Sequence, residues 1–146
     1  MNYTSLICFL FPLFAIGQEH KIYYHLEEAL QNPEQVYELS LTAEMFGDTT
    51  NVIKALPERI GAFINLRRLA IYSDELSELP NSIGKLKNLE VFELSASKLS
   101  KLPESIGQLF SLKELFFVGT NVKTLPKSMA NLKHLKWLYY PEEVSR

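Results

Sequence analysis

A 23-residue phrase that is repeated four times between Leu56 and Tyr140 constrains this chain more than any other feature. Every copy opens with a Leu-Pro pair, and its prolines are Pro57, Pro80, Pro103 and Pro126. One unit of this size cannot bury its own apolar face, so the copies must stack on one another. The repeat therefore predicts a solenoid.

Two apolar spacings alternate within each copy. In the second copy, Ile83, Leu86 and Leu89 are three residues apart, which is typical of a helical or 3₁₀ turn. Phe92 and Leu94 follow at strand spacing, two residues apart, so both point inward while their neighbours point outward. We therefore expect one strand and one short helical turn in each coil.

Proline and glycine occupy fixed places in the phrase. The proline presets φ and needs no amide donor in a first helical turn, so it fits a junction from extended to helical backbone. A glycine follows the isoleucine of the first three copies, at Gly61, Gly84 and Gly107. Its missing side chain permits either close backbone packing or a positive φ.

The phrase resembles the leucine-rich repeat, in which LxxLxLxxNxL is followed by LPxxIxxL, over about residues 33–140. It is most similar to the 23-residue class of Ras-binding scaffold proteins and plant Ras-group-related repeats, here in a small, bacterial-like secreted form. The resemblance implies an α/β solenoid of about five coils with a parallel β-sheet on its concave side. It also implies short helical or 3₁₀ turns on the convex side and a short N-terminal capping helix.

The chain departs from the family at one position. The asparagine that forms a ladder along the stack is replaced by Asp74, Ser97 and Thr120. All three side chains can bond the backbone at the bend, so we expect the turn without a continuous asparagine ladder.

Residues 1–17 differ from the rest of the chain. No residue before Glu19 is charged, and residues 6–16 are almost continuously apolar, too few for a bilayer span of about 20 residues. A small-x-small triplet precedes Gln18. We predict a signal peptide, and therefore a secreted, periplasmic or cell-envelope protein with no stable membrane span after cleavage. Because the leader lacks Lys and Arg, an N-terminal strand or a retained anchor is the alternative.

The remaining sequence divides into three parts. Residues 18–35 form a predicted N-terminal cap, in which Leu26, Ala29 and Leu30 share one helix face. Residues 36–140 form the repeat domain, with an insert at about 43–51 that either carries contacts or is a tolerated insertion. A short tail, 141–146, either folds over the last coil, leaves it frayed, or leaves it for another chain to cover, so self-association through this end is possible.

The residues available for chemistry indicate no enzyme. The single cysteine, Cys8, lies inside the leader, and His20, His25 and His134 form no recognisable catalytic or metal-ligating pair with a carboxylate. We predict no catalytic residue, no metal and no cofactor. A net charge of −2, without a basic stripe, gives no reason to expect nucleic acid as a partner.

The outward strand positions form three predicted rows on the concave face. The rows are Glu38, Arg68, Val91, Glu114, Trp137; then Ser40, Ala70, Glu93, Phe116, Tyr139; and then Thr42, Tyr72, Ser95, Val118. Apolar and aromatic residues gather toward the C-terminal end, and solvent-facing aromatics often anchor protein interfaces. The predicted partner-binding residues are Arg68, Tyr72, Val91, Glu93, Glu114, Phe116, Val118, Trp137 and Tyr139. Alternatively, Trp137 and Tyr139 only shield an uncapped end.

These features favour an exported, non-enzymatic module that binds a protein or peptide on the concave sheet, with a glycan ligand left open. An intracellular signalling scaffold is the alternative that the Ras-group resemblance implies, and it requires a retained leader. A self-associating structural protein is a third hypothesis, based on the uncapped C-terminal coil.

Overall fold

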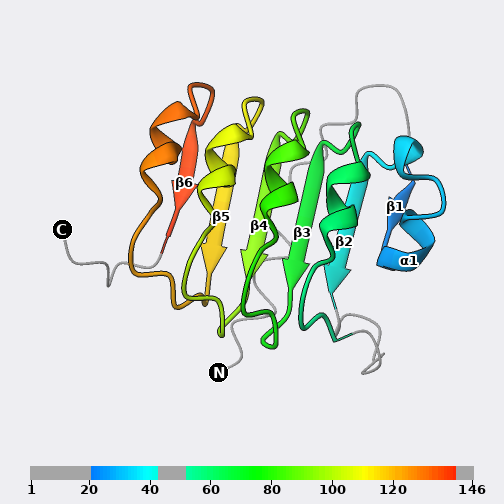
Figure 1. The fold of residues 1–146 in the computed structure, drawn as a ribbon, viewed down its shortest axis with the longest axis horizontal. Helices are drawn as coiled ribbons and strands as arrows, with labels where there is room; N and C mark the ends of the chain where they lie inside the picture. Colours follow the sequence, from blue (N-terminus) through cyan, green and yellow to red (C-terminus); the bar gives the residue numbers. More distant parts are fainter. Residues whose placement is uncertain (1–20, 43–51, 141–146) are drawn as a thin grey trace.

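The computed structural model describes residues 21–42 and 52–140, which form one parallel sheet with short helical turns along one face (Figure 1). The strands lie in sequence order and are β1 Ile22–Tyr23, β2 Glu38–Thr42, β3 Arg68–Tyr72, β4 Val91–Ser95, β5 Glu114–Val118 and β6 Trp137–Tyr139. The helices are α1 Leu26–Ala29 and the 3₁₀ helices η3 Pro33–Gln35, η4 Glu58–Ala62, η5 Asn81–Lys85, η6 Glu104–Gln108 and η7 Lys127–Asn131. The predicted solenoid is confirmed. The predicted leader, insert and tail lie outside the described residues.

The 3₁₀ geometry of each turn follows from the three-residue apolar spacing. In the second copy, extended backbone at Pro80 (φ −70°, ψ 154°) leads into η5. The Leu86 amide then donates to the Ile83 carbonyl oxygen at 3.2 Å, and the Leu89 amide to the Leu86 carbonyl oxygen at 3.1 Å. Side chains three residues apart eclipse each other in such turns, so one apolar stripe faces the sheet.

The core consists of apolar columns that run through the stack. One inward row of the sheet is Leu39, Leu69, Phe92, Leu115 and Leu138, aligned strand to strand by the parallel register. Its first four members are almost completely buried. Burying a side chain of this size stabilises a fold by about 1.5–3 kcal/mol, so the rows in the middle of the stack contribute most of the hydrophobic stabilisation.

The glycine column serves close packing of successive turns. A Cβ on Gly84 would lie 2.5 Å from the carbonyl oxygen of Ser105 in the next coil, and a Cβ on Gly107 would lie 2.3 Å from that of Ser128. Neither glycine has a positive φ; among the described residues, only Gly119 does, at 62°. Of the two explanations left open by the sequence, close backbone approach is therefore the one that applies.

Hydrogen bonds at the bend correct one expectation. The Ser97 hydroxyl donates to the Asp74 carbonyl oxygen at 3.4 Å, as expected for a ladder position. The next rung comes from Asn121 rather than Thr120: Asn121 Nδ2 donates to the Ser97 carbonyl oxygen at 2.6 Å. The Thr120 hydroxyl is buried without a hydrogen-bond partner among the described residues. Gly119, with its left-handed backbone, lies two residues before Asn121 in this bend.

The N-terminal end contains the expected helix and one unexpected strand. Helix α1 lies beside β1 at this end of the sheet (Figure 1). Ile22 and Tyr23 of β1 pair in parallel with Glu38 and Leu39, which adds a sixth strand to the five that the repeat predicts. An ion pair between Lys21 Nζ and Glu28 Oε1, 2.5 Å apart, joins the start of β1 to α1.

Candidate interaction surface

The concave face of the sheet carries all nine residues predicted to bind a partner. They occupy outward positions of four adjacent strands, β3 to β6. The three predicted rows are confirmed by the register: in the first, Arg68 pairs with Val91, and Glu114 with Trp137. The parallel pairing brings these residues together because strands lie about 4.8 Å apart. Whether they bind a partner stays a prediction.

Aromatic side chains gather at the C-terminal end of this face. Trp137 and Tyr139 on β6 are 66% and 60% exposed, and Phe116 on β5 is half-buried. Phe116 and Tyr139 are direct register partners, and Trp137 faces the same side two residues before Tyr139. We refer to Phe116, Trp137 and Tyr139 as the aromatic cluster. A rigid, exposed aromatic surface of this kind is where interface hot spots concentrate.

The strand alternation predicts that the Glu93 side chain faces solvent, but the structure shows it buried. It points to the concave side, yet it is only 5% exposed. The Tyr72 hydroxyl reaches across from β3 and donates a hydrogen bond to Glu93 Oε2. Burial raises the pKa of the Glu93 carboxyl, opposed by this hydrogen bond and by the positive charge of Arg68, while the negative charge of Glu114 raises it further. Glu93 therefore lies beneath the exposed side chains of the concave face, and its hydrogen bond positions the Tyr72 ring.

The parts of the concave face on the N-terminal and C-terminal sides of Glu93 differ in their balance of charged side chains. Toward the N-terminal end, Arg68 Nε lies 4.0 Å from Glu38 Oε2, so these two charges offset each other. Toward the C-terminal end, Glu114 lies between Val91 and Trp137 in the register. The acidic side chains thus adjoin the aromatic cluster, whereas the basic one lies two strands away from it.

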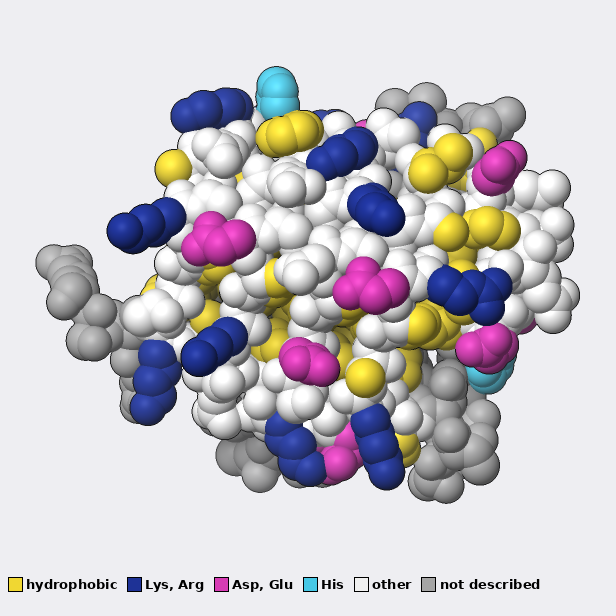
Figure 2. Space-filling model, in the orientation of Figure 1, with side chains coloured by type: hydrophobic (Ala, Val, Ile, Leu, Met, Phe, Trp, Pro, Cys, Tyr) yellow, Lys and Arg dark blue, Asp and Glu magenta, His cyan; other side chains and the backbone are white. Residues whose placement is uncertain are grey.

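The convex face has a different character. Figure 2, in the orientation of Figure 1, shows Lys and Arg scattered over it among carboxylates and separate hydrophobic groups. Ile64 and Phe110 lie in the turns that lead from η4 to β3 and from η6 to β5, and they are 50% and 53% exposed. Lys87 Nζ lies 4.9 Å from the centre of the Phe110 ring and covers part of it. Ile64 and Phe110 belong to the first and third copies of the repeat, so they lie two coils apart.

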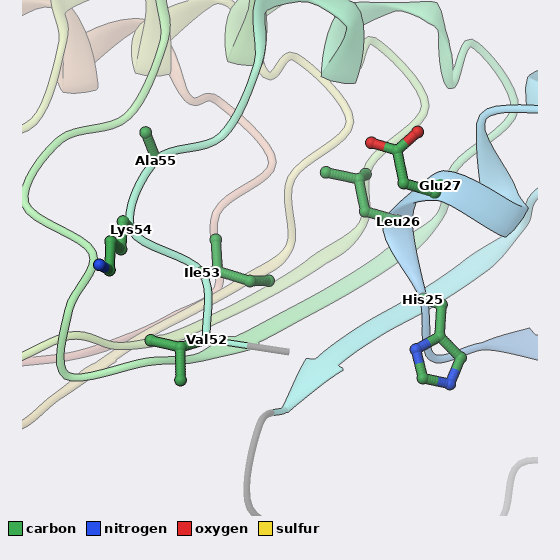
Figure 3. A pocket seen from close by; sticks show the side chains of 7 residues that line it. All are labelled: His25, Leu26, Glu27, Val52, Ile53, Lys54 and Ala55. Carbon is green, nitrogen blue, oxygen red and sulfur yellow. The ribbon is translucent and has the colours of Figure 1, made fainter. Parts of the chain in front are cut away.

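A shallow pocket lies between α1 and residues 52–55 (Figure 3). It is lined by His25, Leu26, Glu27, Val52, Ile53, Lys54 and Ala55. The charged groups of Glu27 and Lys54 project in different directions, so no polar groups converge on a ligand position (Figure 3). Ligand sites usually combine an apolar wall with converging polar groups, so this pocket is the weaker candidate.

Residues 21–42 and 52–140 hold no group of three or more His, Cys, Asp or Glu side chains placed to bind a metal ion. Nor does this part of the chain contain a helix of the length and apolarity that a membrane span requires.

A model of the family described as "Leucine-rich repeat region" matches residues 47–145. Similar solved structures include a leucine-rich repeat protein of Leptospira interrogans and an internalin of Listeria monocytogenes. The Leptospira protein is 29% identical, with a TM-score of 0.60 over 82% of this chain and 41% of that one. The internalin is 20% identical, with a TM-score of 0.60 over 82% of this chain and 32% of that one, and shows the fold alone. This chain thus spans less than half of either relative, and none of the curated proteins compared matches it.

Proposed function

Because the chain belongs to the leucine-rich repeat family, we propose that it is a non-enzymatic interaction module whose concave face binds a protein or peptide. The aromatic cluster carries this proposal, since Trp137 and Tyr139 are the most exposed large apolar side chains among the described residues. Interfaces draw most of their binding energy from a few Trp, Tyr and Arg residues. Tyr72, held by Glu93, and Arg68 extend the same surface.

We also propose that the module acts outside the cytoplasm. The apolar, uncharged leader of residues 1–17 and the small-x-small triplet before Gln18 support this. N-terminal sequencing of the protein purified from its own cells tests the proposal. A sequence that begins at Gln18 is expected, and one that begins at Met1 would contradict export by cleavage.

Capture by crosslinking tests the concave face. The full chain, expressed and processed in its own cells, is compared with a variant in which Tyr72, Phe116, Trp137 and Tyr139 are alanine. A partner held by the wild type and lost by this variant is expected, because truncating anchors of this kind typically costs 2 kcal/mol or more of binding free energy.

The matched control is Ile64→Ala with Phe110→Ala, which removes exposed apolar side chains from turns outside the strands. It should retain the partner. Circular dichroism and urea unfolding must agree between the variants, so that a lost partner is not a lost fold. A partner that depends on Ile64 and Phe110 instead would contradict binding at the concave face.

A further inference from the structure

The charges of the concave face differ in sign from those around it. Its acidic side chains are Glu38, Glu93 and Glu114, and its one basic side chain is Arg68. No lysine lies in any of the six strands; the lysines of the repeats lie in the turns and loops, as on the convex face in Figure 2. A face with this balance attracts positive charge, even though the whole chain is close to neutral.

The carboxylates nearest the aromatic cluster are Glu93 and Glu114. The register pairs Val91 with Glu114 and Glu93 with Phe116, so the two carboxylates lie diagonally across β4 and β5. Burial is the main cause of the raised pKa of Glu93, and the nearby Glu114 carboxylate raises it further. Arg68 offsets part of this charge from β3, but it also lies 4.0 Å from Glu38.

We propose that the occupant of the concave face is a segment of a partner protein that places a lysine or arginine side chain between Glu114 and the aromatic cluster. This inference rests on the proposed function and names the chemistry of its ligand. Charge complementarity carries it: a cation there would lie against the half-buried Glu114 carboxylate and beside the buried carboxyl group of Glu93. An acidic segment would be repelled by the same two groups.

The aromatic cluster suits the same side chain. The faces of Trp, Tyr and Phe attract Lys and Arg cations within about 6 Å of the ring centre. Trp137 pairs with Glu114 and Tyr139 with Phe116, so a guanidinium or ammonium group at this place meets a carboxylate and aromatic rings together. A neutral apolar segment would bury Glu114 without a counter-charge, which costs binding energy.

The two glutamates have different parts in this arrangement. Glu114 is accessible and contacts the cation, whereas Glu93 is almost buried and acts through its charge and through the hydrogen bond that positions Tyr72. Glu114→Gln therefore removes a direct contact. Glu93→Gln removes the buried charge and keeps an oxygen that accepts from the Tyr72 hydroxyl.

A displayed library of random dodecapeptides, selected on the immobilised full chain, tests the proposal. Each enriched peptide is retested on the variant with alanine at Tyr72, Phe116, Trp137 and Tyr139, and on Glu114→Gln. Synthetic versions are then titrated by the fluorescence of Trp137, the only tryptophan of the chain. Glu90→Gln is the matched control, because Glu90 precedes β4 and pairs with Lys113 at 2.5 Å, outside the strands.

We expect peptides that need the aromatic residues to be rich in Lys or Arg and to bind Glu114→Gln about tenfold more weakly, with Glu90→Gln unchanged. Peptides that need the aromatic residues but lack basic residues, or that bind Glu114→Gln as tightly as the wild type, overturn this inference and leave the proposed function standing. If no enriched peptide depends on the aromatic residues, both the inference and the proposed concave site are wrong.

Discussion

The two ends of the sheet differ in how well their last inward-facing side chains are covered. At the N-terminal end, β1 and α1 lie against β2, and the inward Leu39 is only 1% exposed. At the C-terminal end, Leu138 occupies the same inward row but is 43% exposed. Leu115, one strand before it, is completely buried. The exposed fraction of a residue at a given repeat position is thus not set by that position alone. It depends on whether a neighbouring coil or cap packs against its strand.

The last coil also differs from the earlier coils at two positions that contact the following coil. Ala130 stands where the earlier coils have Gly61, Gly84 and Gly107, and Lys127 stands where Glu104 accepts a hydrogen bond from the Ser128 amide at 3.1 Å. The glycine lies against the following coil in all three earlier coils. The glutamate acceptor is present in two of them, where Glu58 accepts from the Ser82 amide and Glu104 from the Ser128 amide. The last coil therefore lacks two features that join one coil to the next.

Truncating one leucine in each region should give the largest effect and the clearest contrast. We expect Leu115→Ala and Leu39→Ala to reduce the free energy of unfolding by about 2–5 kcal/mol, because both leave a cavity in a packed interior. Leu138→Ala should cost about 1 kcal/mol, because its side chain is already in contact with water. Urea unfolding of the three variants measures this. Equal costs for Leu115→Ala and Leu138→Ala would show that the C-terminal end is covered in solution.

The glycine column should give an intermediate effect. Gly107→Ala places a Cβ 2.3 Å from the Ser128 carbonyl oxygen, so η6 and η7 must move apart at a cost of about 1–3 kcal/mol. The reverse change in the last coil, Ala130→Gly, should cost no more than about 1 kcal/mol, the usual difference in backbone entropy. Thermal unfolding of both variants checks this. A stable Gly107→Ala variant would contradict the close approach of the turns.

Glu93 should give the smallest effect, and its sign depends on pH. Because the folded protein raises the pKa of Glu93, its contribution favours folding at low pH and is lost as pH rises through the folded-state pKa. Glu93→Gln should therefore be as stable as the wild type in acid and more stable at neutral pH, by less than the Leu115→Ala cost. Urea unfolding from pH 4 to 8 measures the difference, with Glu90→Gln as control. A wild type and Glu93→Gln that differ equally at every pH would contradict the raised pKa.

Much of this surface could be predicted from the repeat. The 23-residue period places Val91, Glu114 and Trp137 in one row, and the register confirms it. The alternation also sends Glu93 to the concave side, but it does not indicate that Tyr72 from the preceding coil covers it. Strand β1 was missed because two residues, Ile22 and Tyr23, are too few to show an alternating pattern.

By itself, the sequence determined the solenoid, the row in which each strand residue lies and the face to which it points. These follow from periodicity, because a constant repeat length and the alternation of a strand are local properties of the chain. Only the tertiary structure decided which outward residue is buried, which inward residue is exposed and whether Asn121 or Thr120 bonds the previous coil. Those outcomes depend on contacts between coils about 23 residues apart, and each contact is set by side-chain reach and by the neighbour present at that end of the stack.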